Sequence, residues 1–194
     1  MGLVEELAGL RSRVEALTRA VGRHDRVPEV RWGTVTVHND TVTLVSFPGE
    51  SGMVTITRAS CGVWVGAPVL VQVQGQDRYI IGTAATPWQP LPLFNGWQNF
   101  GNGWQTARYR RGAGGQVYLQ GLIRHPNANE TGTVAQVPAG FRPVTGTLMF
   151  STLAGVGTAR ADVDGNGVVS VLGYSSGASS AYVSLSGITY QAEG

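Results

Sequence analysis

Residues 31–47, RWGTVTVHNDTVTLVSF, alternate apolar and polar side chains on both sides of a short polar break. Val35, Val37, Val42 and Leu44 alternate with threonine, which is the pattern of strands that bury one face and expose the other. The His-Asn-Asp break between the two runs is rich in turn-forming residues. This stretch therefore predicts two neighbouring strands of an antiparallel sheet.

Three further β-branched runs follow, MVTITRA (residues 53–59), VLVQVQG (69–75) and RYIIGTA (78–84), separated by glycine- and proline-containing breaks. Five short strands in about 55 residues match the size of a small, partly open barrel such as an OB-fold. We expect an OB-like β-barrel over residues 26–85.

Residues 86–92, TPWQPLP, carry three prolines in seven positions, which excludes a helix or a central strand. We expect a semi-rigid, extended linker here and a domain boundary. From residue 93 to 194 the pattern is again β, with turn signals at nearly regular spacing, and it predicts a β-sandwich or jelly-roll head domain. The expected strands are residues 104–111, 115–124, 132–137, 146–153, 157–163, 167–173 and 181–190.

The first 25 residues have a helical pattern, with apolar side chains spaced alternately by four and three. Glu6 and Arg11 fall at the g and following e positions, where charges pair between parallel helices. A helix of three heptads is marginal alone in water, so we expect a coiled coil of identical chains over residues 1–25. A single amphipathic helix packed on its own domain is the alternative, and the heptads do not separate two strands from three. The seam consists of Leu3, Leu7, Leu10, Val14, Leu17 and Val21.

The composition is that of a glycine-rich, mainly β protein, with 28 glycines and only 13% charged residues. The net charge of +2, carried by 14 arginines and no lysine, indicates no nucleic-acid partner. The N-terminus lacks the pattern of a signal peptide, and no apolar run approaches membrane-spanning length, so we expect synthesis in a cytoplasm and no membrane insertion. Cys61 is the only cysteine, which excludes an intrachain disulfide and favours a buried thiol.

DVDGNG, residues 162–167, matches the first half of a calcium-binding loop, with Asp162, Asp164 and Asn166 as ligands. The twelfth position, which should be a bidentate glutamate, is Gly173. Asp-Gly and Asn-Gly between alternating runs are strong hairpin signals, so the pattern favours a tight turn, with a cation site as the alternative.

No catalytic set stands out in the sequence. His24, His38 and His125 fall in three different segments, and Glu130 with Asp162 would form a glycosidase pair only if folding brought them together. No nucleophile elbow, phosphate-binding loop or dinucleotide fingerprint is present. We expect neither an enzyme nor a bound cofactor.

Three stretches suit sugar recognition: the aromatic run LFNGWQNFGNGW (93–104) and the polar loops 124–132 and 174–182. The alternatives are tryptophans that pack in the core and loops that are simply solvated. Arg110 and Arg111 suit a phosphate-bearing polymer or, alternatively, an exposed turn. The candidate glycan-binding residues are Trp97, Trp104, His125, Asn127, Asn129, Glu130 and Tyr174.

The order G-W…G-W, then YRRGAGGQVYLQG, VPAGFRP, ARADVDGNG and a final VSLSGITY resembles the C-terminal head domains of phage tail-fibre and receptor-binding proteins. The match covers residues 93–190, about half of the chain, and VPAGFRP is its most specific part. The preceding strands look like the small barrel modules of phage tail and baseplate proteins. The resemblance implies a homotrimer without cofactor, in which the G-W…G-W aromatics mainly pack against strands or a neighbouring subunit.

These observations together predict a virion structural protein, a homotrimeric tail-fibre or tail-tip component whose head binds host surface glycan. Its expected partners are copies of itself, other virion proteins and host polysaccharide, and its expected place is the virion surface. A capsid decoration or head-fibre protein with a structural role is the alternative. A depolymerase that depends on Glu130 or Asp162 is a third hypothesis.

Overall fold

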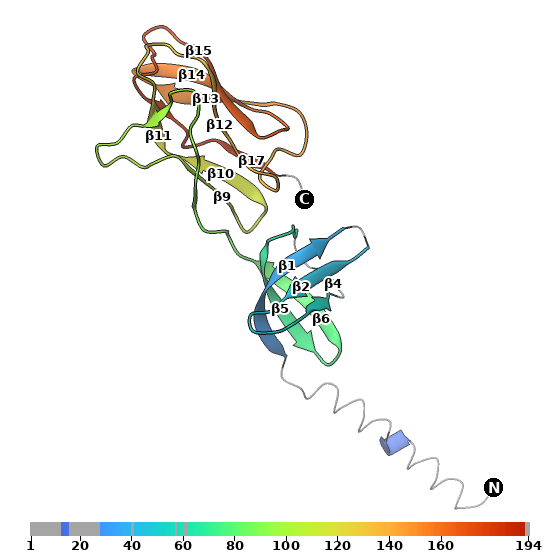
Figure 1. Cartoon of the computed structure of the whole chain (residues 1–194). Coiled ribbons are helices and arrows are strands. Elements are labelled where there is room, and N and C mark those ends of the chain that lie inside the picture. The colour runs from blue at the N-terminus through green and yellow to red at the C-terminus, as the bar shows by residue number, and fades with distance from the viewer. Residues whose placement is uncertain (1–12, 16–27, 40, 57, 60–61, 193–194) are drawn as a thin grey trace, which may run out of the picture.

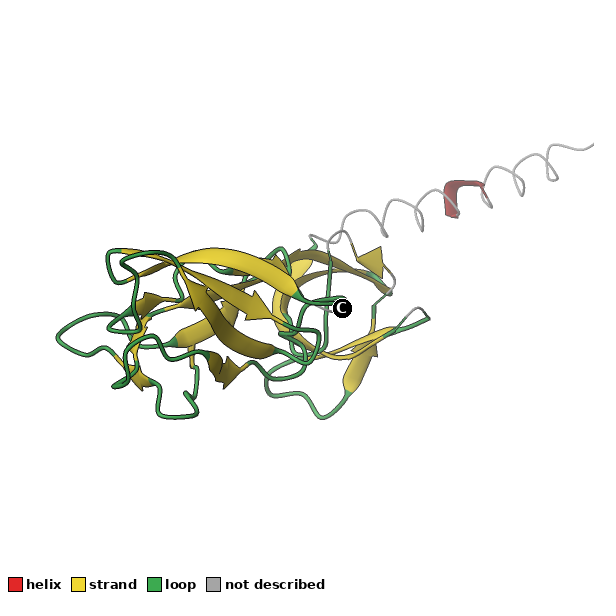
Figure 2. Ribbon diagram, turned by 90° about the horizontal axis from the view of Figure 1, so that it is seen from above, coloured by secondary structure: helices red, strands yellow, loops and turns green. Residues whose placement is uncertain are grey.

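The computed structural model describes residues 13–15, 28–39, 41–56, 58–59 and 62–192, and these residues form a mainly β structure (Figure 1). Strands and loops make up nearly all of it, as Figure 2 shows. No helix among the described residues is long and apolar enough to cross a membrane. Residues 13–15 are helical, and Val14 of the predicted seam is exposed there. The other seam positions, Leu3, Leu7, Leu10, Leu17 and Val21, and also Cys61, lie outside the described residues.

The first sheet, which we call the curled sheet, has six strands in the order β3-β2-β1-β5-β6-β4. All neighbours are antiparallel except β4 and β6, which run parallel. Every strand predicted between residues 31 and 84 is present. The bounds are β1 (Glu29–His38), β2 (Thr43–Ser46), β3 (Met53–Thr55), β4 (Arg58–Ala59), β5 (Pro68–Gln74) and β6 (Asp77–Thr83).

The run predicted as one strand at residues 53–59 differs in the structure, because it supplies both β3 and β4, which lie at opposite ends of the sheet order. Three residue steps, from Thr55 to Arg58, span at most about 10 Å. The two ends of the sheet must therefore approach each other, and the sheet curls into a half-barrel. Ile56, between them, is buried and donates its N–H to the Thr43 carbonyl oxygen (2.9 Å).

The curl encloses a core of its own. Gly33 on β1 is fully covered, and a methyl group there would collide with the side chain of Val45 on the neighbouring β2. The close contact of β1 and β2 therefore depends on the missing side chain. The core consists of Val35, Val45, Phe47, Ile56, Val63, Trp64, Ala67, Val69, Val71 and Ile80.

The chain after residue 86 forms two antiparallel sheets, one of four strands (β17-β10-β9-β7) and one of seven (β12-β15-β14-β13-β16-β11-β8). We call them the C-terminal sheets. Side chains from both enter one core, for example Val117 and Leu119 from the smaller sheet and Val134 and Val171 from the larger. The bounds are β7 (Gln89–Pro90), β8 (Gln98–Asn99), β9 (Arg108–Arg111), β10 (Gln116–Gln120), β11 (Leu122–Arg124), β12 (Gly132–Gln136), β13 (Leu148–Ala154), β14 (Gly157–Val163), β15 (Val168–Tyr174), β16 (Val183–Ser184) and β17 (Thr189–Gln191).

Two of the predicted strands pass from one sheet to the other. The run 115–124 breaks at Gly121 into β10 of the smaller sheet and β11 of the larger. The run 181–190 breaks into β16 and β17 in the same way. Gly121 has a φ of 128°, and a methyl group there would lie 2.6 Å from the backbone of Ala107. Glycine is therefore required where the chain changes sheet.

The proline-rich segment 86–92 is extended, as its sequence predicts, and it packs on the C-terminal sheets. β7 pairs with β9, and the Thr86 N–H donates to the Arg111 carbonyl oxygen (2.8 Å). The Trp88 ring lies between two guanidinium groups, those of Arg108 and Arg110, each 4.5 Å from its centre. The segment is thus the edge of a sheet.

Arg111 is buried at the junction with the curled sheet, which corrects the expectation of an exposed turn at this position. Its guanidinium group donates to the carbonyl oxygens of Gly115 (3.1 Å) and Gly140 (2.6 Å). The same group lies 4.2 Å from the ring centre of Trp64 in the core of the curled sheet. One side chain therefore joins the two parts of the molecule.

We expect Gly121→Ala to destabilise the protein by about 2 kcal/mol or more, because the new side chain meets both a left-handed φ and the Ala107 backbone. The melting temperature should fall by about 5 °C or more in a thermal scan of the full chain. Gly114→Ala is the matched control, since a methyl group there meets no atom within 4 Å. An unchanged melting temperature for Gly121→Ala would contradict this account of the sheet crossing.

Candidate functional site

His125 directly follows β11 and is only 8% exposed. Its Nδ1 accepts the N–H of Asn127 (3.1 Å), so its Nε2 carries the proton and donates to the Asn95 carbonyl oxygen (3.0 Å). Trp97, itself buried, packs against the imidazole with ring centres 5.4 Å apart. These two candidate sugar contacts therefore form part of the interior.

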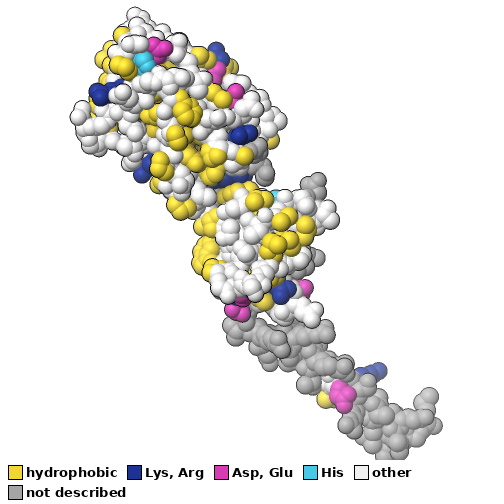
Figure 3. Space-filling view, viewed as in Figure 1, with side chains coloured by type: hydrophobic (Ala, Val, Ile, Leu, Met, Phe, Trp, Pro, Cys, Tyr) yellow, Lys and Arg dark blue, Asp and Glu magenta, His cyan; other side chains and the backbone are white. Residues whose placement is uncertain are grey.

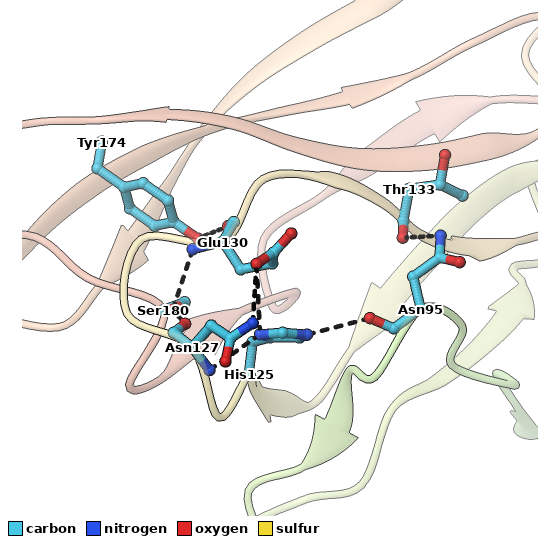
Figure 4. Close-up of polar contacts among 7 residues, drawn as sticks. All are labelled: Asn95, His125, Asn127, Glu130, Thr133, Tyr174 and Ser180. Carbon is cyan, nitrogen blue, oxygen red and sulfur yellow. Dashed lines mark hydrogen bonds and ion pairs between the residues drawn. The ribbon is translucent and has the colours of Figure 1, made fainter.

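The loop after His125 is held by polar groups of its own and by two hydroxyl groups from later segments (Figure 4). Ser180 Oγ donates to the Asn127 carbonyl oxygen (2.5 Å), and the Tyr174 hydroxyl donates to the Glu130 carbonyl oxygen (2.6 Å). The Glu130 carboxylate lies 3.4 Å from the Asn127 amide nitrogen and 3.8 Å from Nδ1 of His125. The structure thus brings four of the predicted sugar-binding residues together, and their hydrogen bonds shape the loop.

Two further residues of this region complete the frame. Asn95 donates its side-chain amide to the Thr133 carbonyl oxygen (3.0 Å), which ties the segment before β8 to β12. Asn129 is exposed and has a φ of 61°, a turn conformation that asparagine tolerates. The loop is therefore a rigid support, and Asn127 and Asn129 are its exposed amides.

We expect Tyr174→Phe to destabilise the protein by about 1 kcal/mol, because the Glu130 carbonyl loses its donor. Burial, and to a lesser extent the Glu130 charge, raises the pKa of Tyr174 above its ordinary value, although the Ser180 hydrogen bond opposes this. The stabilisation of the fold by the Tyr174 hydroxyl is therefore fully present below about pH 10. It decreases above that pH, where the tyrosine of the unfolded chain loses its proton. The difference between wild type and variant should shrink above that pH.

Urea unfolding at pH 8 and at pH 10.5 measures this difference. Tyr118→Phe is the control, because that hydroxyl bonds Gln116 Oε1 at an exposed position. An equal loss in both variants, or a difference that grows with pH, would argue against the role assigned to Tyr174.

Trp104 lies apart from this loop and is 62% exposed. Its ring meets the edge of Phe100 (centres 6.5 Å apart), and Phe100 in turn meets Tyr182 (5.9 Å). A tight turn with Asn102 at a φ of 52° places Trp104, whose N–H donates to the Gly101 carbonyl oxygen (2.9 Å). We call Phe100, Trp104 and Tyr182 the aromatic platform.

The platform lies across β11, because Phe100 follows β8, Tyr182 precedes β16, and both strands flank β11. Ile123 in the middle of β11 points into the core, so its neighbours Leu122 and Arg124 point outward on the platform side. On the face drawn in Figure 3, hydrophobic side chains are exposed on the C-terminal sheets, with few charged side chains between them.

Two shallow hollows lie beside one another on the C-terminal sheets. The first, of about 390 Å³, is lined by residues 90–93, 97–99, 106 and 107. The second, of about 310 Å³, is lined by Pro92, Phe94, Tyr109, Gln136, Val137, Pro138 and Arg142. Pro92 lines both, and the loop that carries Trp104 begins and ends at the first hollow, between Asn99 and Thr106. Their volumes lie in the range of small-molecule sites.

DVDGNG forms the turn between β14 and β15. Asp164 Oδ1 accepts the N–H groups of Asn166 and Val168 (both 2.8 Å), and Gly167 has a φ of 80°. The Asp162 carboxylate instead binds the guanidinium group of Arg160 through both oxygens (2.8 and 2.6 Å). The two carboxylates thus have different partners, and no group of three or more His, Cys, Asp and Glu in the described part of the chain is placed to hold a metal.

The chemistry available at this surface is stacking and hydrogen bonding. Among the described residues that line the two hollows there is no carboxylate and no histidine. Glu130 contacts His125 and Asn127, and Asp162 contacts Arg160, so each candidate acid has its own partner.

No protein-family model, curated protein or solved structure matches this chain. The site is therefore defined by geometry alone. The sequence indicated Trp104 by itself, and it indicated Phe94, Phe100 and Tyr182 only as parts of the stretches 93–104 and 174–182; Arg142 was missed. Phe100 lies four residues before Trp104 across a Gly-Asn-Gly turn, which is a usable signal. Tyr182 lies in a distant segment before β16, and nothing in the sequence links it to Trp104.

Proposed function

We propose that this protein is a non-enzymatic virion surface protein, a homotrimeric tail-fibre or tail-tip component that binds host polysaccharide through the aromatic platform. In this proposal residues 1–25 form the trimeric coiled coil, the curled sheet is an OB-like barrel, and the C-terminal sheets are a sandwich-type head. The resemblance of residues 93–190 to phage head domains supports the assignment to a virion.

The observation that carries the binding proposal is the exposure of Trp104. A tryptophan that leaves 62% of its surface in water forgoes most of the gain from burial. Its contact with Phe100, and the contact of Phe100 with Tyr182, fix the ring in place before any ligand arrives. The apolar faces of sugar rings stack on such surfaces, and the exposed Gln98 lies two residues before Phe100 in the sequence.

Three copies on one coil would bring three platforms to the same host surface. Each platform is small, and its affinity for a sugar chain is modest by itself. Linked sites act at high effective concentration, so the trimer binds a repetitive polymer much more tightly than one chain does.

A capsid decoration or head-fibre protein is the second candidate, and one observation favours it. Met149, Leu153 and Val156 are exposed on the hairpin of β13 and β14, at 67%, 54% and 87%. Exposed apolar groups of this kind are typical of contacts between proteins. Electron microscopy of labelled particles separates the two candidates, since the label marks either the tail end or the capsid surface.

We expect Trp104→Ala to reduce binding of the full chain to host polysaccharide about tenfold or more, because the platform loses its most exposed ring. The fold should persist, since most of the side chain lies in water. Binding to immobilised host polysaccharide is the measurement. Trp32→Ala is the matched control, since Trp32 on β1 is a 55% exposed tryptophan of the curled sheet. Equal binding by both variants and the wild type would refute the platform's role.

We expect the full chain, of 20.5 kDa, to sediment as a trimer at micromolar concentration. Leu10→Glu should yield single chains, because it places a charge in the predicted seam. The single chains should bind a polysaccharide-coated surface at least about tenfold more weakly than the trimer. Arg19→Glu, at an f position of the predicted heptads, which faces away from the seam, is the control and should remain trimeric. A wild type that sediments as one chain would overturn the trimer.

A further inference from the structure

Arg142 has a buried hydrogen-bond donor that the fold does not use. Its side chain lines the second hollow together with Pro92, Phe94 and Tyr109. Its Nε is buried and has no hydrogen-bond partner among the described residues. Buried N–H groups of folded proteins are nearly always paired, and an unpaired one reduces stability. Because this Nε is shielded from solvent, a ligand in the hollow would meet Arg142 through the part of its side chain that lines the hollow.

The walls of this hollow are rigid and largely apolar. The Tyr109 ring is fixed by an edge-on contact with Phe141 (centres 4.9 Å apart), and Phe94 is 43% exposed. Burial raises the pKa of Tyr109, so its hydroxyl stays neutral and able to donate. Among the described lining residues Arg142 is the only charged group. An anion that enters therefore meets a positive charge and no carboxylate of the lining.

We propose that this hollow, the Arg142 pocket, binds the anionic group of an acidic saccharide, either a sugar carboxylate or a sugar phosphate. The inference rests on the proposed function and specifies its ligand class. A guanidinium group presents a planar fork of N–H donors that matches both anions. Such charge-assisted hydrogen bonds are strong where apolar walls limit access of water.

The position of the pocket fits one extended polymer chain. Pro92 lines both hollows, and Asn99 and Thr106, which also line the first hollow, are the residues directly before and after the loop that carries Trp104. A chain that stacks one ring on the platform can thus follow the first hollow towards Arg142. The platform supplies affinity for a sugar ring, and the pocket selects a charged one.

Arg110 provides an internal comparison, because its Nε is also buried without a partner among the described residues. Its guanidinium group, however, lies over the Trp88 ring (4.5 Å) and near the Tyr118 ring (5.6 Å). Its charge is therefore already stabilised by two aromatic faces. Arg110 lines neither hollow, so the argument applies to Arg142 alone.

The test is calorimetric titration of the full chain with three probes of equal length: a neutral oligosaccharide, an oligogalacturonate and a ribitol-phosphate oligomer. We expect at least one acidic probe to bind tenfold or more tightly than the neutral one. Arg142→Gln should remove this preference and leave the neutral probe unaffected. Arg160→Gln removes the same charge from an exposed arginine that lines neither hollow and pairs with the buried Asp162, and it should bind within twofold of the wild type. The better acidic probe distinguishes a carboxylate from a phosphate.

The pocket is refuted if Arg142→Gln keeps the preference for the acidic probe. It is also refuted if both arginine variants lose this preference equally, because that would indicate general charge attraction. If Arg142→Gln does not fold, Phe94→Ser at the exposed wall replaces it and should weaken acidic probes at least fivefold. A wild type that binds all three probes equally also refutes the pocket.

The Arg142 pocket and the proposed function can be refuted independently of each other. If Trp104→Ala loses binding to the neutral oligosaccharide, this result bears on the aromatic platform and not on the Arg142 pocket. If the wild type binds no oligosaccharide, inorganic phosphate and glucuronate should still shift the NMR signals of Tyr109 in the wild type but not in Arg142→Gln. Absence of that shift would refute the pocket.

Discussion

The C-terminal sheets depend on one backbone constraint, the passage of the chain through Gly121. Because β10 and β11 are halves of one run, the two sheets are fixed to each other at the point where they share a core. That passage presses against Ala107 and leaves no room for a side chain. It also determines where β11 lies, and β11 carries the platform on one side and leads into the His125 loop at its end.

Alternation of apolar and polar residues was sufficient to locate most of the β runs, because burial on one face is a local property of the sequence, but it missed β7 and β8 and the breaks within three runs. It could not predict that residues 53–59 supply both ends of the curled sheet, since that depends on how far the sheet curls. The same limit applies to the site. Trp97 and Trp104 each follow glycine in one short stretch, yet one is buried and the other exposed. The polar residues of loop 124–132 suited sugar, but Ser180 and Tyr174 approach from other segments and bond the loop instead.

The surface that remains for a ligand combines two kinds of chemistry. The aromatic platform offers the exposed ring of Trp104, held by edge-to-face ring contacts, and the Arg142 pocket offers one positive charge between apolar walls. Neither requires a moving part, because the groups around them are fixed by hydrogen bonds and ring contacts. A preorganised surface loses little entropy on binding, which would suit the proposed recognition of a repetitive polymer through a small contact area.

The packed segment 86–92 has a mechanical consequence. Trp88 is held between Arg108 and Arg110, and Arg111 lies against Trp64 of the curled sheet. The connection therefore cannot act as a swivel, and a sideways force on the C-terminal sheets is transmitted to the curled sheet as torque. The direction of the C-terminal sheets is therefore set by the curled sheet, and the two parts together respond to a load as a stiff lever.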